Sequence, residues 1–166
     1  CHLGIARTFQ VVKPFETISV FDNVVVGGFC RAKSRAEAEL AAREALEITR
    51  FGSRAVMQAQ NLTIAGLKRL ELARALATRP ELLLLDEVVA GCNPKESDEL
   101  VETIRDVRER GVTILIIEHV MKALMALSDR VVVLHNGELI ANGTPAQIAV
   151  DENVVKAYLG DDYGSA

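Results

Sequence analysis

Two short apolar runs, each followed by polar residues, constrain the fold of this chain more than any other feature. The first covers 82–85 and leads directly to Asp86 and Glu87, and the second covers 112–117 and ends shortly before His119. Continuous apolar runs of this length are typical of strands that are buried on both faces of a parallel sheet. The two runs therefore predict an α/β fold.

Segments with a helical spacing of apolar residues lie before and between these runs. The clearest covers 31–50, where Ser34 and Glu37 fit a capping box, and Ser19 is a candidate cap for the helix expected at 17–29. Strands that alternate with helices indicate a parallel sheet with right-handed crossovers, and the mostly helical first half indicates an inserted helical subdomain. The expected strands are 4–9, 82–85, 112–117, 131–134 and 138–141, with a hairpin turn at Asn136 and Gly137, and the expected helices are 17–29, 31–50, 67–77, 94–110, 120–127, a short one beginning at Thr144 and Pro145, and 154–159.

The composition is that of a folded chain that is not built to bind nucleic acid. Hydrophobic residues make up 49% and charged residues 25%, as in ordinary globular domains. The net charge of −4, from 19 basic and 23 acidic residues, argues against a nucleic-acid interface. No run approaches the roughly 18 apolar residues of a membrane-spanning helix. Cys1, Cys30 and Cys92 are an odd set without metal-ligand spacing, so we expect a soluble chain in a reducing, intracellular compartment.

Two adjacent carboxylates follow the first apolar run. Asp86 and Glu87 should lie at the carboxyl edge of a buried parallel strand, which is where ligands bind in open α/β sheets. One carboxylate at such a position can hold Mg²⁺ through its water shell, and the next can orient or deprotonate an attacking water. The alternative is a strand that ends in a solvated acidic turn.

A histidine follows the second apolar run. His119 should lie at the same edge of the sheet as Glu87, one or two strands away. A single histidine at a strand end is more often structural than catalytic. The presence of Asp86 and Glu87 at the same edge favours a functional role.

The segment 61–76 begins with small residues and continues as a basic helix. Exposed N–H groups at a helix N-terminus, together with nearby cations, suit an anion such as phosphate. The alternative is a capped amphipathic helix with a basic outer face. The small residues are Thr63, Ala65 and Gly66, and the cations are Lys68, Arg69 and Arg74.

The order of these motifs resembles that of ATP-binding cassette (ABC) transporter nucleotide-binding subunits. Gln10, LTIAGLKRLELARAL, LLLLDE, AGCNPKE and IIEH follow one another as the family's motifs do. The wording ARTFQ, NPKE, VVVLHNGELIANGTP and VVKAYLG is similar to the branch that energises bacterial branched-chain amino acid uptake. The resemblance implies a RecA-like core of a P-loop NTPase at about 1–10 and 76–160, with a helical signature subdomain at about 11–75.

The resemblance implies a role for each polar residue of the strand ends. Gln10 resembles the Q-loop glutamine, which touches the Mg²⁺ and water site and senses the membrane subunit. Asp86 resembles the Walker B aspartate, Glu87 the catalytic glutamate and His119 the switch histidine that contacts the γ-phosphate. Asn93 occupies the place of the D-loop aspartate.

The segment that matches the family signature LSGGQ departs from it. Thr63 keeps the hydroxyl, but Ile64 and Ala65 replace two glycines and Gly66 replaces glutamine, while Leu62 is retained. Ile64 places a β-branched side chain where a phosphate must approach the backbone closely. In the loop before Asn93, valine at 88 replaces the common proline and cysteine at 92 replaces leucine.

The phosphate-loop motif G-x-x-x-x-G-K-[ST] does not occur in this sequence. The resemblance implies that this loop and the adenine-stacking aromatic residue lie before Cys1. We therefore expect the chain to be the C-terminal two-thirds of a cassette and inactive alone. The alternative is a natural gene product that lost its phosphate loop.

The resemblance also implies a function and partners. The intact protein is expected to bind ATP and Mg²⁺ and to hydrolyse ATP for amino acid import, at the inner face of the plasma membrane. Two cassettes, identical or different, sandwich two ATP molecules, and the permease subunits contact the Q-loop and the helical subdomain. The competing hypothesis is a non-hydrolysing binding module, in which 11–29 docks a coupling helix of the permease.

The missing phosphate loop has a consequence for the sheet. In the family, its strand lies between the strand that ends at His119 and the strand 131–134. Without it, the edge of 112–117 is unpaired, which costs about 1–3 kcal/mol for each buried and unsatisfied polar group. We expect the two flanking strands to pair directly, or a second molecule to supply a strand, with partial disorder in the C-terminal part as the weaker third option.

Overall fold

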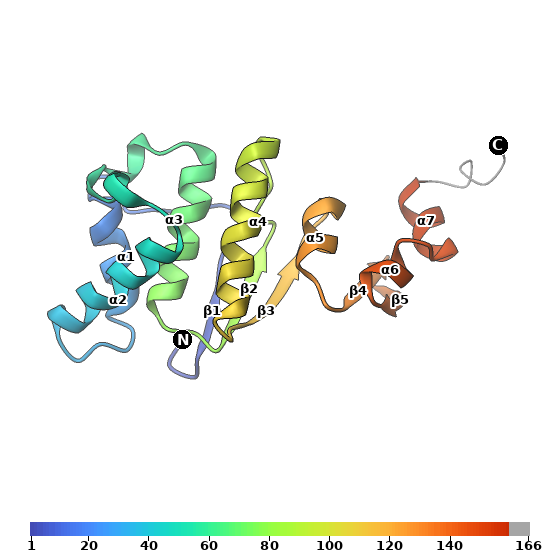
Figure 1. Cartoon of the computed structure of the whole chain (residues 1–166), viewed down its shortest axis with the longest axis horizontal. Helices are drawn as coiled ribbons and strands as arrows, with labels where there is room; N and C mark the ends of the chain where they lie inside the picture. Colours follow the sequence, from blue (N-terminus) through green and yellow to red (C-terminus); the bar gives the residue numbers. More distant parts are fainter. Residues whose placement is uncertain (160–166) are drawn as a thin grey trace. The chain divides into compact units, whose positions relative to one another are not determined.

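A computed structural model describes residues 1–159 of the chain. The chain divides into two compact units, Cys1–Ala123 and Leu124–Ala166, and the second is described as far as residue 159. The first unit contains a parallel sheet with its helices, and the second contains an antiparallel hairpin (Figure 1). Residue 160, the last of the predicted core range and of the VVKAYLG match, lies outside the described residues.

The sheet of the first unit has three parallel strands in the order β1-β2-β3. They are β1 (Ile5–Arg7), β2 (Leu82–Asp86) and β3 (Thr113–Ile117). The predicted runs at 82–85 and 112–117 are therefore strands, and their parallel pairing is confirmed. Because the strands run in one direction, their carboxyl ends meet at one edge of the sheet.

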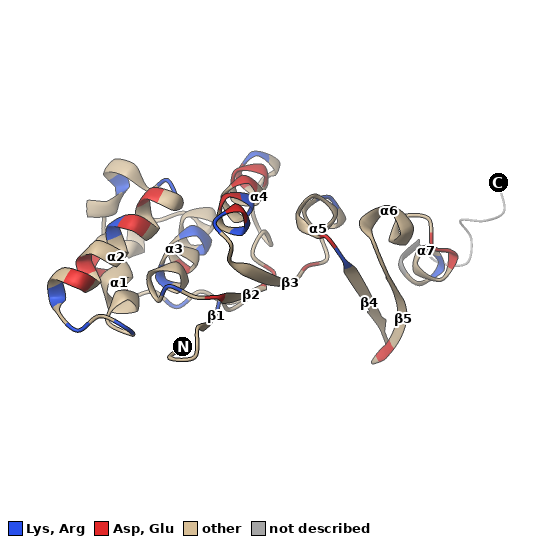
Figure 2. Cartoon of the chain, turned by 60° about the horizontal axis from the view of Figure 1, so that its bottom comes forward, with Lys and Arg blue, Asp and Glu red and all other residues tan. Residues whose placement is uncertain are grey.

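The two faces of this sheet differ in burial. Leu83 and Leu85 are 0% and 1% exposed, whereas Leu115 and Ile117 are 58% and 62% exposed. Figures 1 and 2 show helix α4 (Pro94–Glu109) over one face of the strands. The expectation that both runs are buried on both faces is therefore wrong for β3. Alternate residues of a strand point to opposite faces, so an uncovered face leaves every second side chain in solvent.

Three helices pack closely beside the sheet. They are α1 (Val20–Gly28), α2 (Arg35–Ile48) and α3 (Ile64–Ala77), with the 3₁₀ helices Gly52–Val56 and Ala59–Asn61 between the last two. Glycine allows α1 to approach both of its neighbours. A Cβ on Gly27 would lie 2.3 Å from the Arg74 carbonyl oxygen, and one on Gly28 would lie 2.6 Å from that of Ala38.

The helix starts show which predicted caps form. Ser19 caps α1 as predicted, since its Oγ accepts the Asp22 N–H. At α2, Ser34 Oγ accepts the Glu37 N–H, but the Glu37 carboxylate accepts the N–H of Lys33 rather than that of Ser34. The predicted capping box is therefore only half formed. A complete box occurs instead at α4, between Asn93 and Glu96.

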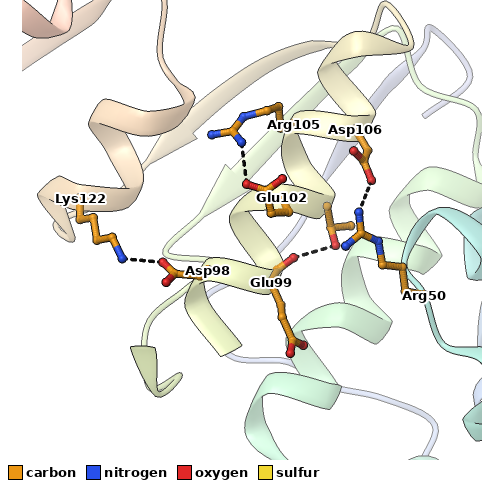
Figure 3. Close-up of polar contacts among 8 residues, drawn as sticks. Arg50, Asp98, Glu99, Glu102, Arg105, Asp106 and Lys122 are labelled. Atoms are coloured by element: carbon orange, nitrogen blue, oxygen red, sulfur yellow. Dashed lines mark hydrogen bonds and ion pairs between the residues drawn. The ribbon is translucent and has the colours of Figure 1, made fainter. Parts of the chain in front are cut away.

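Acidic side chains of α4 hold neighbouring segments in place (Figure 3). Asp106 pairs with Arg50 of the α2 C-terminus at 2.7 Å, and Asp98 pairs with Lys122 at 2.7 Å. Figure 2 shows acidic and basic residues along α4. Exposed pairs of this kind contribute little each, about 0–1 kcal/mol, so α4 is held mainly by its buried face, which includes Leu100 and Ile104.

The second unit is a hairpin covered by short helices. Strands β4 (Val131–His135) and β5 (Glu138–Gly143) pair in antiparallel fashion, and the predicted turn has positive φ angles of 51° at Asn136 and 84° at Gly137. Its core consists of Val131, Val133, Ile148 and Val154. The helices are α5 (Met121–Leu127), whose start belongs to the first unit, α6 (Pro145–Ile148) and α7 (Glu152–Leu159).

The expected closure of the sheet does not occur. Among residues 1–159, β3 pairs with β2 alone, and β4 pairs with β5 in a separate sheet. Direct pairing of the two flanking strands is therefore wrong for this structure. Strand β4 pairs instead with β5, which follows it through a two-residue turn. Pairing with a second molecule stays a prediction.

Because β3 has a free edge and an apolar open face among the described residues, residues 1–166 should self-associate in proportion to concentration. Leu115→Lys places a charge on that face and should weaken the association at least about tenfold, since lysine on an edge strand opposes pairing. Analytical ultracentrifugation measures this. Val56→Lys, at an 82% exposed position outside the sheet, is the charge-matched control and should associate as the unchanged chain does. A chain that stays monomeric at all concentrations contradicts the prediction.

Candidate functional site

The carboxyl edge of the three strands gathers four of the predicted residues. Gln10 lies just beyond β1, Asp86 ends β2 and Glu87 follows it, and His119 follows β3. The Gln10 amide Nε2 donates to Glu87 Oε2 at 2.6 Å, and His119 Nδ1 lies 3.8 Å from Glu87 Oε1. Glu87 is therefore the residue that both neighbours approach. The alternative of a solvated acidic turn therefore does not describe this site, because the Glu87 carboxylate has contacts with other side chains.

The backbone of Glu87 is held in an uncommon conformation. Its φ angle is +47°, in the left-handed region that non-glycine residues rarely adopt. Its N–H donates to the Ile117 carbonyl oxygen at 2.9 Å, and its own carbonyl oxygen accepts from Lys68 Nζ at 3.0 Å. Contacts on both sides of the residue thus define where its carboxylate points.

Asp86 forms an ion pair that sequence analysis did not find. Arg7 Nη2 donates to Asp86 Oδ2 at 3.0 Å, and the Arg7 guanidinium lies 5.0 Å from the centre of the Phe9 ring. The Asp86 N–H donates to Thr8 Oγ1 at 3.3 Å. The one sequence signal for this pair was the alternation of side chains along β1. Ala6 points to the buried core, so its neighbour Arg7 points to the opposite face of the strand.

The oxygen donors at this edge suit Mg²⁺. Mg²⁺ prefers oxygen ligands and is usually bound by one or two carboxylates together with substrate phosphates and water. The Asp86 carboxylate and the Gln10 side-chain carbonyl are donors of this type. Within residues 1–159 no group of three or more His, Cys, Asp and Glu side chains is arranged to hold a metal ion. The donor set therefore fits a metal that arrives with a phosphate ligand rather than one held by protein alone.

The cations of α3 do not form a basic outer face. Lys68 and Arg69 are 6% and 7% exposed. Lys68 Nζ donates to the carbonyl oxygens of Gln10 and Glu87, and Arg69 pairs with Glu99 of α4 at 2.9 Å, which lowers the pKa of the Glu99 carboxyl. Arg74 donates to the Lys13 carbonyl oxygen at 3.1 Å. The alternative of a solvated basic face is therefore wrong, because α3 is buried almost all round.

The segment 62–66 forms the start of α3. Thr63 is its N-cap, with Oγ1 accepting the Gly66 N–H at 3.2 Å, and Ala65 and Gly66 are buried. Ile64 is 60% exposed, so a β-branched side chain stands at the end of the helix where an anion would bind. A Cβ on Gly91 would lie 3.6 Å from Ile64 Cγ2, which places this segment beside the loop between Glu87 and Asn93.

Glu118 ties that loop to the end of β3. Its Oε1 accepts the Val89 N–H at 2.9 Å, and its Oε2 is buried without a hydrogen-bond partner among the described residues. Of the residues that follow β3, the sequence pointed to His119 as functional and did not single out Glu118. Asn93 lies at the far end of the same loop and serves as the N-cap of α4.

A cavity of about 700 Å³ adjoins the site within the first unit. Its lining includes the side of β1, the segment after it, α1 and α3. Cationic, acidic and apolar groups all contribute to the wall. The residues relevant here are Arg7, Gln10, Lys13, Val26, Arg74 and Asp86.

Comparisons with known proteins identify the family. The ABC transporter family pattern matches residues 2–90, and the branched-chain amino acid ATP-binding cassette transporter pattern matches residues 138–164. The high-affinity branched-chain amino acid transport ATP-binding protein LivG of Escherichia coli is 41% identical over 96% of this chain and 69% of its own length. BraF of Pseudomonas aeruginosa, described in the same words, is 40% identical over 95% of this chain and 68% of its own length.

Solved structures show the same fold. The ADP conformation of MJ1267, an ATP-binding cassette of an ABC transporter, has a TM-score of 0.82 and 28% identity, over 96% of this chain and 70% of that one. The α/β cassette fold is thereby confirmed. The chain belongs to the ATP-binding subunits of the ABC transporter family, in the branched-chain amino acid branch. Within residues 1–159 the structure holds no helix long and apolar enough to cross a membrane.

Glu71 of α3 should make the free energy of unfolding of this protein depend on pH. Its carboxylate is buried and accepts the Phe9 N–H at 3.0 Å. Burial raises the pKa of the Glu71 carboxyl, while that N–H and the charges of Lys68 and Arg74 act to lower it. Because the pKa is raised in the folded state, the protonated Glu71 carboxyl stabilises the fold relative to the ionised carboxylate. This contribution to the free energy of unfolding is complete below the pKa of the unfolded state, and it is lost as the pH rises through the pKa of the folded state.

Glu71→Gln keeps an oxygen acceptor but has no charge to bury. Its free energy of unfolding relative to the unchanged protein should therefore rise between about pH 4, near the ordinary glutamate pKa, and about pH 7. Thermal unfolding at both pH values measures the difference. Glu102→Gln, on the exposed side of α4, is the control and should show no such rise. A difference that stays constant or shrinks with pH contradicts the prediction.

Proposed function

We propose that this chain carries the water-activating side of an ATPase site in a transporter that imports branched-chain amino acids. The observation that supports this best is the contact of Glu87 with both Gln10 and His119, directly beside Asp86. An acid that is held between an amide and an imidazole, next to a carboxylate suited to Mg²⁺, has the layout needed for phosphoryl transfer to water. The names of LivG and BraF support the transported class.

Glu87 is proposed to orient the attacking water and accept its proton. The Gln10 amide donates to one carboxylate oxygen, which leaves Oε1 for the water. His119 has its Nδ1 toward Glu87 and is 62% exposed, so its other ring nitrogen is accessible to a γ-phosphate oxygen. Bound Mg²⁺ would neutralise the charge of the phosphates, and Asp86 with Gln10 would hold it through water. Catalysis on these terms is positioning together with charge stabilisation.

The parts of the chain are proposed to divide this work. Residues 1–10 and 76–160 would form the α/β core, and 11–75 the helical signature subdomain. Leu62, Thr63, Ile64, Ala65 and Gly66 would close over ATP held by a second cassette, with Asn93 nearby. The cavity beside Gln10, α1 and α3 supports docking of a permease subunit there. The assembled protein would work in the cytoplasm, at the inner face of the plasma membrane.

A non-hydrolysing binding module is the second candidate. The cavity that supports permease docking is complete within the first unit and needs no nucleotide. The two candidates differ in what Glu87 contributes. Loss of the Glu87 carboxylate would leave a docking module unaffected, whereas it would disable an ATPase.

Residues 1–166 alone should bind Mg-ATP no more tightly than about 1 mM. Most charge-assisted hydrogen bonds to the phosphates come from the amides and the lysine of a phosphate loop, and this sequence has none. Isothermal titration calorimetry measures the Kd, with Asp86→Asn as a check that any weak binding is at this site. Micromolar affinity would overturn this expectation.

In a full-length cassette that contains these residues and a phosphate loop, Glu87→Gln should lower kcat by about 10²–10⁴-fold, because the amide cannot accept a proton. The Kd for Mg-ATP should change little, since the amide keeps the shape. His119→Ala should likewise lower turnover more than binding. Phosphate release and nucleotide binding measure the two quantities, and Glu102→Gln is the matched control. Near-normal turnover in the Glu87 variant would remove Glu87 from this role.

A further inference from the structure

Lys68 is a buried lysine of α3 that contacts the main chain of the candidate site. Its side chain is 6% exposed, and its Nζ donates to the Gln10 carbonyl oxygen at 2.8 Å and to the Glu87 carbonyl oxygen at 3.0 Å. Removing an ammonium group from water is unfavourable unless its N–H groups find acceptors. Here two of its three N–H groups have them, and both acceptors belong to the proposed catalytic site.

The two acceptors belong to residues whose side chains meet. Gln10 Nε2 donates to Glu87 Oε2 at 2.6 Å, so Lys68, Gln10 and Glu87 form a closed ring of three hydrogen bonds. Each bond involves a charged donor or acceptor, and such bonds are shorter and stronger than neutral ones. A displacement of the Lys68 ammonium would therefore move both ends of the Gln10–Glu87 contact.

Lys68 also supports the unusual backbone of Glu87. A φ angle of +47° costs free energy in a residue with a side chain and persists only where surrounding contacts maintain it. On one side, the Glu87 N–H is bound by Ile117 of β3. On the other side, the Glu87 carbonyl oxygen is bound by Lys68, so the ammonium and β3 together fix the direction of the carboxylate.

The same lysine connects these residues to the start of α3. Lys68 lies in the first two turns of a helix that begins at Ile64 and is capped by Thr63. A helix moves as a stiff body, so a tilt of its N-terminus would shift the Lys68 side chain with it. The proposed contact of residues 62–66 with a second cassette would act on that N-terminus.

We propose that Lys68 is a positioning residue that sets the geometry of the Gln10–Glu87 pair and couples it to the N-terminus of α3. It touches main-chain carbonyls rather than a substrate, so it acts through Gln10 and Glu87. The inference rests on the proposed ATPase function. Arg69 provides a comparison on the same helix, because it is equally buried but pairs with Glu99 of α4.

The test uses the full-length cassette in its assembled transporter. Lys68→Met removes the charge and both hydrogen bonds while keeping the length, and should lower kcat by about 10- to 100-fold, as expected for a displaced catalytic group. The KM for ATP should change by less than about threefold, because the loss is in the transition state. Lys68→Arg restores a buried cation and should recover part of kcat. Arg69→Met should lower the Tm but keep kcat within about twofold.

A double-mutant cycle separates positioning from general stability. Because Lys68 acts through the Gln10–Glu87 pair, Lys68→Met should cost less kcat in a Gln10→Ala background than in the unchanged protein. If Lys68→Met does not fold, Lys68→Gln takes its place in every comparison. Full kcat in the Lys68 variants, or equal losses in Lys68 and Arg69 variants, overturns the inference. Failure of the proposed function looks different, because the unchanged assembly would then hydrolyse no ATP or Glu87→Gln would be fully active.

Discussion

Parallel pairing of β1, β2 and β3 is the constraint on which the candidate site depends. In such a sheet the strands all end at one edge, so residues far apart in the sequence come together without any dedicated loop. Gln10 and Glu87 are 77 positions apart and still meet at 2.6 Å. A shift of one residue in the register of β2 would turn Asp86 to the other face and break its contact with Arg7.

The candidate site also depends on helix α3, which supplies buried cationic side chains. The polar groups at the end of a sheet include carbonyl oxygens that have no partner strand beyond them. Lys68 satisfies two of these, and Arg69 connects the same helix to α4. The buried charges thus join the sheet edge and two helices. Glu71 adds a buried carboxylate beside them, which partly balances the local positive charge.

Local features of this structure were predictable from the sequence, and features that depend on packing were not. The strands at 82–85 and 112–117, the Ser19 cap and the turn at Asn136 and Gly137 follow from residues adjacent in the chain. The burial of Lys68 and the open face of β3 depend on which elements cover which surface, and no local pattern records that. The contacts of Arg7 and Glu118 cross between segments, so neither residue stood out in its own motif.

The Arg7–Asp86 pair bears on how a metal could reach this site. The Arg7 side chain is 54% exposed and that of Asp86 is 26% exposed, so water competes for both. An ion pair with this exposure contributes about 0–1 kcal/mol, far less than a buried pair would. A divalent cation that arrives with phosphate ligands offers the carboxylate a stronger partner. The Asp86 carboxylate can therefore exchange Arg7 for another cation at small cost in free energy.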